Sequence, residues 1–134
     1  FGAVIAPYGI LQSLIRDRDL NATLEAVARV VKPGGILGLD LVPDVPNWKE
    51  YSQRLQMRGR AAKGTHLTLL ESVRQDRKRR LTIFEQTYVE RRGKVSREHR
   101  FDLVFRTLPI ASMRKRLERV GFEVDLVLGD YQGN

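Results

Sequence analysis

The stretch Val30-Val31-Lys32-Pro33-Gly34-Gly35-Ile36-Leu37-Gly38-Leu39-Asp40 decides the fold of this 134-residue chain. Before it, apolar residues recur at helical spacing from Leu20 to Val31, which predicts an amphipathic helix. Pro33 cannot continue a helix, and the two glycines after it permit the chain to reverse. Residues 36–42 are then almost wholly apolar, which is typical of a strand covered on both faces. The stretch therefore predicts a helix, a tight reversal and a buried strand.

A second buried strand is predicted upstream of the helix. Phe1 to Ala6 is an apolar run that Pro7-Tyr8-Gly9 closes, and residues 9–15 can then form a helical turn. Asp19 or Asn21 is expected to cap the helix start by accepting hydrogen bonds from its free amides. Lys32 is expected in the last helical turn, where a cation suits the helix dipole.

Two buried strands joined through a helix are expected to be parallel neighbours with a right-handed crossover. This arrangement is one unit of a doubly wound α/β sheet. A ligand of such a sheet lies beyond the carboxyl ends of the strands. Those ends are here Ala6-Pro7-Tyr8 and Asp40-Leu41-Val42-Pro43.

The pattern changes after Pro46. Residues 47–63 are polar and helix-compatible, and residues 67–73, 81–90 and 95–106 read as strands. The last three runs alternate between polar and apolar residues, so they predict an antiparallel three-strand meander with one face in water.

The end of the chain returns to the α/β pattern. Residues 109–120 predict a helix, Gly121 suits the left-handed position after it, and residues 123–128 predict a strand before the loop 129–133. We therefore divide the chain into residues 1–46 and 107–134 as core and residues 47–106 as an inserted helix and sheet, within one domain.

Composition excludes several classes of protein. The chain has no cysteine, and His66 and His99 do not form a metal-ligand spacing. No apolar run approaches the ~20 residues that cross a bilayer, and no signal peptide is visible, so a cytoplasmic location is expected. The net charge of +8 fits nucleic acid, an acidic substrate or an anionic membrane as a partner. It fits equally a solvated surface, or a piece of a protein whose other half is more acidic.

Three segments carry a resemblance to a known family. Residues 4–14 resemble the fourth strand and following loop of class I S-adenosylmethionine-dependent methyltransferases, and residues 24–41 resemble their next helix, Lys-Pro-Gly-Gly turn and fifth strand. Residues 117–124 are similar to their last helix and sixth strand, followed by the Gly-Asp-Tyr-x-Gly loop at 129–133. The fold class that this implies is the C-terminal part of a Rossmann-like sheet with an inserted antiparallel meander.

The resemblance implies S-adenosylmethionine as cofactor. Ala6 and Pro7 would pass their backbone beside its sulfonium, while Tyr8 and Gln12 would face the methyl-transfer cavity and the substrate. The family's glycine-rich loop and ribose-binding acid are not recognised in the sequence, so the chain alone is expected to bind the cofactor weakly or not at all. The resemblance names no catalytic residue, and Tyr88, His66 and His99 are more simply structural or exposed.

The substrate is expected to be a small or medium acceptor, with an anionic group as one option, chosen by residues 47–106. One alternative is a basic RNA-binding or RNA-methylating module, in which two arginine-rich hairpin tips, 74–80 and 91–97, form one phosphate-binding patch. Another is a non-catalytic oligomerisation fragment. Whichever of these functions the chain has, a homo-oligomer through exposed sheet edges is expected, because open strand edges pair with other strands.

Overall fold

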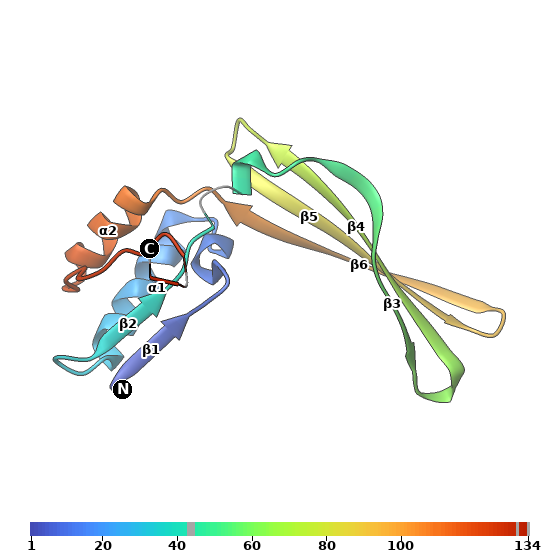
Figure 1. Cartoon of the computed structure of the whole chain (residues 1–134), viewed down its shortest axis with the longest axis horizontal. Helices are drawn as coiled ribbons and strands as arrows, with labels where there is room; N and C mark the ends of the chain where they lie inside the picture. The colour runs from blue at the N-terminus through green and yellow to red at the C-terminus, as the bar shows by residue number, and fades with distance from the viewer. Residues whose placement is uncertain (43–44, 131, 134) are drawn as a thin grey trace. The chain divides into compact units, whose positions relative to one another are not determined.

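The computed structural model describes residues 1–42, 45–130, 132 and 133, and the chain forms two compact units (Figure 1). The first unit combines Phe1–Pro43 with Leu108–Asn134, and the second unit is Asp44–Thr107. Pro43, at the predicted strand end, and Tyr131, in the predicted 129–133 loop, lie outside the described residues.

The first unit contains the predicted strand-helix-strand arrangement. Its elements are β1 (Ala3–Ala6), η1 (Ile10–Ser13), α1 (Asp17–Val30), β2 (Ile36–Leu39) and α2 (Ile110–Arg119). β1 and β2 are parallel neighbours, with Ala3 opposite Ile36 and Ala6 opposite Leu39. The predicted parallel pairing is therefore confirmed.

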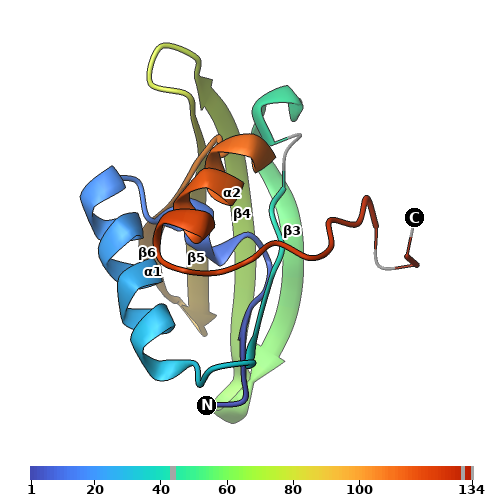
Figure 2. The same ribbon diagram turned by 90° about the vertical axis from the view of Figure 1, so that its left-hand side faces the viewer.

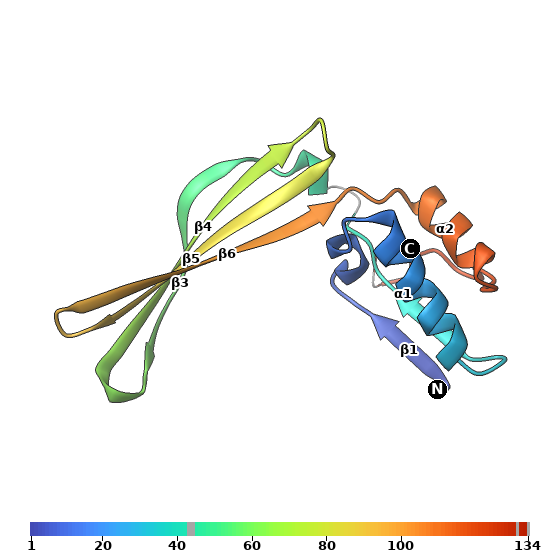
Figure 3. The ribbon, with the colours of Figure 1, turned by 180° about the vertical axis from the view of Figure 1, so that it is seen from behind.

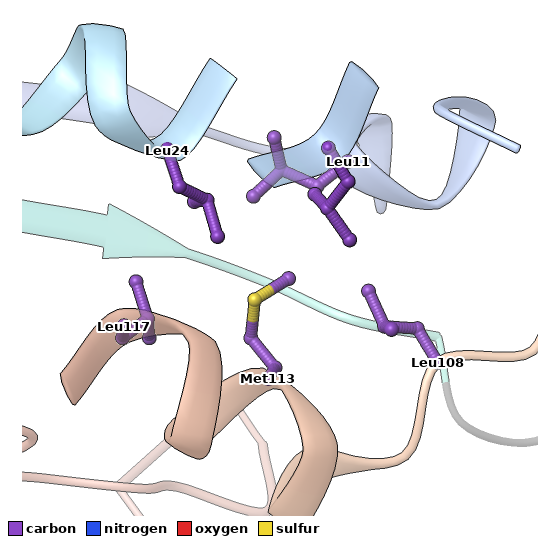
Figure 4. Packing of buried hydrophobic residues seen from close by; sticks show 6 residues of the cluster. Leu11, Leu24, Leu108, Met113 and Leu117 are labelled. Carbon is purple, nitrogen blue, oxygen red and sulfur yellow. The ribbon is translucent and has the colours of Figure 1, made fainter. Parts of the chain in front are cut away.

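The core of the first unit lies between the helices and the two strands. α1 and α2 lie next to each other (Figure 2), and apolar side chains from both point into a shared cluster (Figure 4). The buried members are Leu11, Leu20, Leu24, Leu108, Met113 and Leu117. The opposite side of the strand pair is open: Ile5 is 75% exposed and Ile36 is 69% exposed. The expected cover on both strand faces is thus present on one face only among the described residues.

The start of α1 differs from the sequence prediction. Arg16 occupies the N-cap position without a side-chain cap, and Asp17 and Asp19 lie inside the first turn. Neither Asp19 nor Asn21 is therefore the N-cap, because the helix begins earlier than its apolar stripe. Asn21 instead accepts a hydrogen bond from Arg116 of α2 at 2.5 Å. The Asp17 and Asp19 carboxylates lie at the positive end of the helix dipole, where negative charge stabilises the helix.

The ends of the two helices are also defined. α1 ends at Val30, so Lys32 lies beyond it and Arg29 is the cation of the last turn. α2 ends as predicted: Gly121 has a φ of 93°, and the Phe122 N–H donates to a carbonyl of the last turn at 3.0 Å. Glycine adopts this left-handed conformation without the clash that a Cβ would cause.

The strand predicted at residues 123–128 is wrong. These residues follow α2 without forming a strand, although Val124 packs against the core of the first unit. An isolated extended segment has no ladder of backbone hydrogen bonds, and no strand of the described chain lies in register with this one. Val124 is the one apolar residue of this segment that packs on the core, whereas Leu126 is 71% exposed, Val127 46% and Leu128 48%.

The second unit is a four-stranded antiparallel meander (Figure 3). Its strands are β3 (Tyr51–Ala61), β4 (Thr65–Asp76), β5 (Leu81–Arg92) and β6 (Val95–Arg106), with short helices η2 (Val45–Asn47) and η3 (Ala62–Gly64). The three predicted strands are confirmed as β4, β5 and β6. The helix predicted within residues 47–63 is wrong, because β3 occupies most of that range and adds a fourth strand.

Candidate functional site

A strained turn follows β1 at the carboxyl edge of the parallel strands. Tyr8 has a φ of 59° and Gly9 a φ of 61°, and the Ile10 N–H donates to the Pro7 carbonyl at 3.2 Å. The left-handed conformation is uncommon for an aromatic residue. Since Tyr8 is also 86% exposed, burial of its ring does not offset this strain. Conformations of this kind concentrate at functional sites.

The end of β2 fixes this turn through polar contacts. The Gly9 N–H donates to the Asp40 carboxylate at 2.6 Å, and the Asp40 N–H donates to the Ala6 carbonyl at 3.3 Å. Gln12 donates to the Val42 carbonyl at 3.2 Å and accepts from the Val42 N–H at 2.7 Å. The loops after both strands are therefore held together by side chains and backbone.

Gly9 is required at this place for space as well as for conformation. An added Cβ would lie 2.7 Å from the Gln12 Oε1 and 3.2 Å from a Val42 methyl group. The first distance is shorter than van der Waals contact, so a larger residue would displace Gln12. The turn, Gln12 and Val42 consequently form one interlocked structure.

The four predicted site residues fall into two groups. Pro7 and Tyr8 are exposed at the carboxyl end of β1, and Ala6 is partly buried there, so this backbone segment is open to a ligand. Gln12 is fully buried, and its amide is engaged with Val42. Gln12 thus offers no exposed atom to a substrate in this structure, and its contact with the substrate stays a prediction.

Sequence reasoning missed the role of Asp40. The signal was present, because an acidic residue at the end of an apolar strand run faces the ligand edge of the sheet. Its carboxylate is within reach of the β1 turn only because the two strands are adjacent and parallel.

The second unit carries a polar network centred on Glu71. One carboxylate oxygen accepts from the Tyr51 hydroxyl at 2.5 Å and from Gln56 at 3.0 Å, and the other accepts from Gln86 at 2.9 Å. Burial, followed by the hydrogen bond to Glu71, raises the pKa of the Tyr51 hydroxyl above its ordinary value. Arg54 lies 5.4 Å from the centre of the Tyr51 ring.

Aromatic side chains are next to one another in the same unit. Phe84 packs edge-on against Trp48 at a centroid distance of 5.5 Å and against Phe105 at 5.7 Å. Tyr88 packs in the same manner against Phe101 at 5.8 Å. Edge-to-face contact is a favourable arrangement of two aromatic rings.

The residues weighed for a catalytic role occupy ordinary structural positions. His66 is exposed, and the half-exposed His99 lies 3.8 Å from the Glu90 carboxylate. Tyr88 is engaged with the Phe101 ring. Among the described residues there is also no group of three acidic, histidine or cysteine residues that could hold a metal ion.

The expectation that the two arginine-rich hairpin tips form one patch is wrong. The turn at residues 77–80 precedes β5, and the turn at 93–94 follows it. β5 has 12 residues, so the tips are separated by roughly 40 Å at about 3.3 Å per residue. Nucleic-acid binding stays a prediction, without this argument in its favour.

Comparison with solved structures identifies the fold. A sugar N-methyltransferase, KedS8 from a Streptoalloteichus species, has a TM-score of 0.73 at 17% identity, over 90% of this chain and 47% of that one. The amino pentose methyltransferase CalS10 from Micromonospora echinaspora, solved with S-adenosylmethionine bound, has a TM-score of 0.68 at 19% identity, over 99% and 55%. DesVI from Streptomyces venezuelae has a TM-score of 0.72 at 17% identity, over 99% and 55%.

The chain spans about half the length of these structures. No protein-family model and no curated protein matches the sequence. The chain has the fold of about half of a class I S-adenosylmethionine-dependent methyltransferase, which confirms the fold expected from the sequence motifs. None of the helices in the described part of the chain is long and apolar enough to cross a membrane.

Proposed function

We propose that the chain is part of an S-adenosylmethionine-dependent methyltransferase that acts on a small molecule. The observation that supports this most directly is the β1 turn, where Pro7 and Tyr8 are exposed on a strained backbone at the carboxyl edge of two parallel strands. Structures with this fold include one with the cofactor bound. The chain covers about half of each of these structures, so the activity of the whole protein is part of the proposal.

The residues around the turn fit a cofactor of this kind. Ala6 and Pro7 would line one side of the cofactor with their backbone. The Pro7 ring would fix the direction of the loop, and Pro7 has no N–H to donate. Asp40 and Gln12 would keep the loop in place, since both bind the backbone of the turn or of the strand end beside it. Tyr8 would lie toward the acceptor.

The cofactor would supply an activated methyl group on a sulfonium. The tasks left to the protein are to align the acceptor atom for an in-line displacement and to exclude water. A general base is needed only when the acceptor must lose a proton before the methyl group is transferred. Asp40 and Gln12 would contribute to this alignment by holding the turn in place.

We propose a sugar-like acceptor carrying an amine or a hydroxyl group. Two structures of similar fold are named as a sugar N-methyltransferase and an amino pentose methyltransferase. The Glu71 network and the ring pairs of the second unit offer hydrogen-bonding groups beside flat apolar surfaces, as sugar rings require. The second unit would then select the acceptor, and the first unit would bind the cofactor.

The test uses the natural protein expressed from its complete coding sequence. Radiolabelled S-adenosylmethionine is incubated with a panel of amino sugars, neutral sugars and an RNA of random sequence. Methyl transfer to a sugar supports the proposal, and transfer to RNA alone contradicts the acceptor class. Absence of cofactor binding in the natural protein would contradict the proposed activity as a whole.

A further inference from the structure

Two hairpin turns lie at the same end of the meander (Figure 1): the turn between β3 and β4 and the turn between β5 and β6. Successive strands of an antiparallel meander reverse direction, so every second turn falls at the same end of the sheet. The chain beside these two turns, residues 58–66 and 91–97, contains arginine, lysine and histidine but no aspartate or glutamate. This end of the sheet is therefore strongly cationic.

Strand register brings three side chains of this end into one row across the sheet. Arg60 of β3 is opposite His66 of β4, and His66 is opposite Arg91 of β5. The register between β3 and β4 is regular from Met57 to Ala61, so Arg60 lies outside the irregular part of β3. Residues directly opposite each other in an antiparallel pair project from the same face of the sheet. Arg60, His66 and Arg91 therefore form one row on one face, which we name the arginine–histidine row.

The spacing of the arginine–histidine row suits one small anion. Neighbouring strands lie about 4.8 Å apart, so the backbones that carry Arg60 and Arg91 are separated by roughly 10 Å, with His66 between them. Two long arginine side chains can bend toward each other across such a distance, and the imidazole lies between them. The planar guanidinium group donates two parallel hydrogen bonds to the oxygen atoms of a phosphate. The row can therefore surround a single phosphate group from three directions.

The side chains of the row are available to a ligand. Arg60, His66 and Arg91 are all exposed. Neither arginine forms an ion pair with a residue in the described part of the chain. The Arg91 Nε donates to the Gly93 carbonyl at 3.5 Å, and this contact does not use the two terminal nitrogens of the guanidinium. An anion can therefore bind without breaking an existing ion pair.

The acidic residues closest to the row in the strand register are engaged with other partners. Glu98 of β6 projects from the same face and accepts a hydrogen bond from Arg100 at 3.2 Å. Glu90 precedes Arg91 in the sequence and so projects from the opposite face, where its carboxylate lies 3.8 Å from His99. Neither carboxylate is paired with the row, which therefore retains its positive charge.

The row is separate from the Glu71 network. His66 and Glu71 are an odd number of residues apart on β4, so they project from opposite faces of the sheet. The register between β4 and β5 is continuous from His66 to Asp76, which leaves this alternation intact. A ligand of the row would therefore occupy a different site from the proposed methyl acceptor.

The arrangement favours a small ligand over a nucleic-acid strand. Proteins that bind single strands combine a line of cations with aromatic side chains on which the bases stack. The ring pair of Tyr88 and Phe101 lies on the other face, because Tyr88 is opposite Leu69, an odd number of residues from His66. The cations of the row consequently lack these rings beside them.

We propose that the arginine–histidine row binds the phosphate group of a small molecule other than the methyl acceptor. Arg60 and Arg91 donate to the phosphate oxygens from two sides, and the His66 imidazole donates between them. The hydroxyl of Ser96, which is opposite Arg91 on β6, is the fourth donor of the same row. This inference does not rest on the proposed methyl transfer, and its failure would leave that proposal untouched.

NMR of the histidine side chains measures binding at the row directly. The 134 residues contain two histidines, and His99 projects from the opposite face, so it is an internal control for His66. The natural protein from its complete coding sequence is labelled at histidine and titrated with inorganic pyrophosphate at constant pH and ionic strength. His66→Gln and His99→Gln assign the two signals. Pyrophosphate is expected to shift the His66 signal to saturation and to leave the His99 signal in place, and equal shifts of both signals would overturn the proposal.

Variants that remove one charge test the role of each arginine. Arg60→Gln and Arg91→Gln are each expected to weaken pyrophosphate binding by about 10-fold, because each removes a charged donor. Arg60→Lys should lose less affinity than Arg60→Gln, since it keeps the charge but not the planar fork. Arg77→Gln, in the turn at the other end of the sheet, is the matched control and should leave binding unchanged. Equal losses in Arg77→Gln and Arg60→Gln would show that the net charge of the protein attracts the anion, which would contradict a site at the row.

A short oligouridylate tests whether the phosphate belongs to a nucleic acid. The row is expected to bind pyrophosphate at least as tightly as the oligonucleotide, because one phosphate group fills it. Arg97→Gln changes a cation of the opposite face and should leave pyrophosphate binding unchanged. Tighter binding of the oligonucleotide, weakened by Arg97→Gln as much as by Arg60→Gln, would assign this end of the sheet to nucleic acid and overturn the proposal of a small ligand.

Discussion

Gln12 and Val42 exchange two hydrogen bonds, with the Val42 N–H donating to the Gln12 Oε1 at 2.7 Å and the Gln12 amide donating to the Val42 carbonyl at 3.2 Å. The contact joins the loop after β1 to the loop after β2. Since Gln12 is fully buried, these bonds have little competition from water. The Gln12 amide therefore adds a buried link between the two loops to the one that Asp40 makes with Gly9.

Replacing Gln12 by Ala is expected to lower the free energy of unfolding by about 2–4 kcal/mol, because both backbone groups of Val42 lose their partner. Urea unfolding followed by circular dichroism measures the change. Gln12→Glu is a finer probe, since it retains an oxygen acceptor but loses the amide donor and adds a buried charge. Ser13→Ala, on the exposed side of the same turn, is expected to stay within about 0.5 kcal/mol of the unchanged protein. Equal effects at positions 12 and 13 would show that the Val42 contact contributes nothing.

Gly9 and Gly93 form a matched pair, with φ values of 61° and 59°. A Cβ at Gly93 would meet open space, whereas a Cβ at Gly9 would meet Gln12 at 2.7 Å. Gly93→Ala is expected to cost about 1 kcal/mol from conformation alone, and Gly9→Ala about 2–4 kcal/mol because steric overlap adds to it. Thermal unfolding of the two variants compares the costs. If both variants lose the same stability, steric overlap with Gln12 adds nothing to the cost of Gly9→Ala.

The Tyr51 hydroxyl is expected to titrate later than an ordinary tyrosine. Burial and then the hydrogen bond to Glu71 raise its pKa above the ordinary value of 10.0. Because the folded pKa is raised, its contribution to stability is complete below pH 10.0 and is lost as the pH rises through the folded pKa. Absorbance titration of tyrosinate should show a late step that Tyr51→Phe removes.

Glu71→Gln should shift the late tyrosinate step toward lower pH without abolishing it, since burial is the larger cause. Tyr88→Phe is the control and should leave that step in place. A late step that survives in Tyr51→Phe would assign it to another tyrosine.

Regular hydrophobic patterns predicted most of the fold. The helical stripe of α1 and the apolar run of β2 predicted the parallel pair, because buried parallel strands need continuous apolar residues. β3 escaped prediction since its side chains are mostly exposed and its stability comes from backbone bonds to β4, which leave no pattern in the sequence. The wrong prediction of a strand at residues 123–128 is the opposite case: the apolar pattern is present, but no described strand lies beside it to pair with.

The position of the candidate site in the fold was predictable, and its internal contacts were not. The carboxyl ends of the parallel strands placed Pro7 and Tyr8 correctly at an exposed edge. The burial of Gln12 depends on Val42, which lies 30 residues away in the sequence, and local spacing contains no information about such a contact. The positive φ of Tyr8 was equally hidden, because aromatic residues rarely adopt it.

The 134-residue chain alone is expected to bind S-adenosylmethionine weakly or not at all. Its resemblance to the methyltransferase family assigns most cofactor contacts to a glycine-rich loop, and the described turn at Ala6 and Pro7 provides only one side of a site. Isothermal titration calorimetry of the chain is the measurement, with the natural protein from its complete coding sequence as the control. Micromolar affinity of the chain alone would show that its own residues suffice.

Substitution of Tyr8 is expected to raise the stability of the protein and to lower its activity. Its φ of 59° is unfavourable for an aromatic residue, and its ring is 86% exposed, so the substitution Tyr8→Asn should raise the free energy of unfolding by about 0.5–1 kcal/mol. Asparagine tolerates the left-handed conformation better than tyrosine does. The same substitution in the natural protein should reduce methyl transfer, because the proposed acceptor side of the turn loses its ring. Arg80 is the matched control, with a φ of 57° in the turn between β4 and β5. Arg80→Asn should give a similar gain in stability and leave methyl transfer unchanged, so a stabilised Tyr8→Asn protein with full activity would show that the strain at Tyr8 serves no function in catalysis.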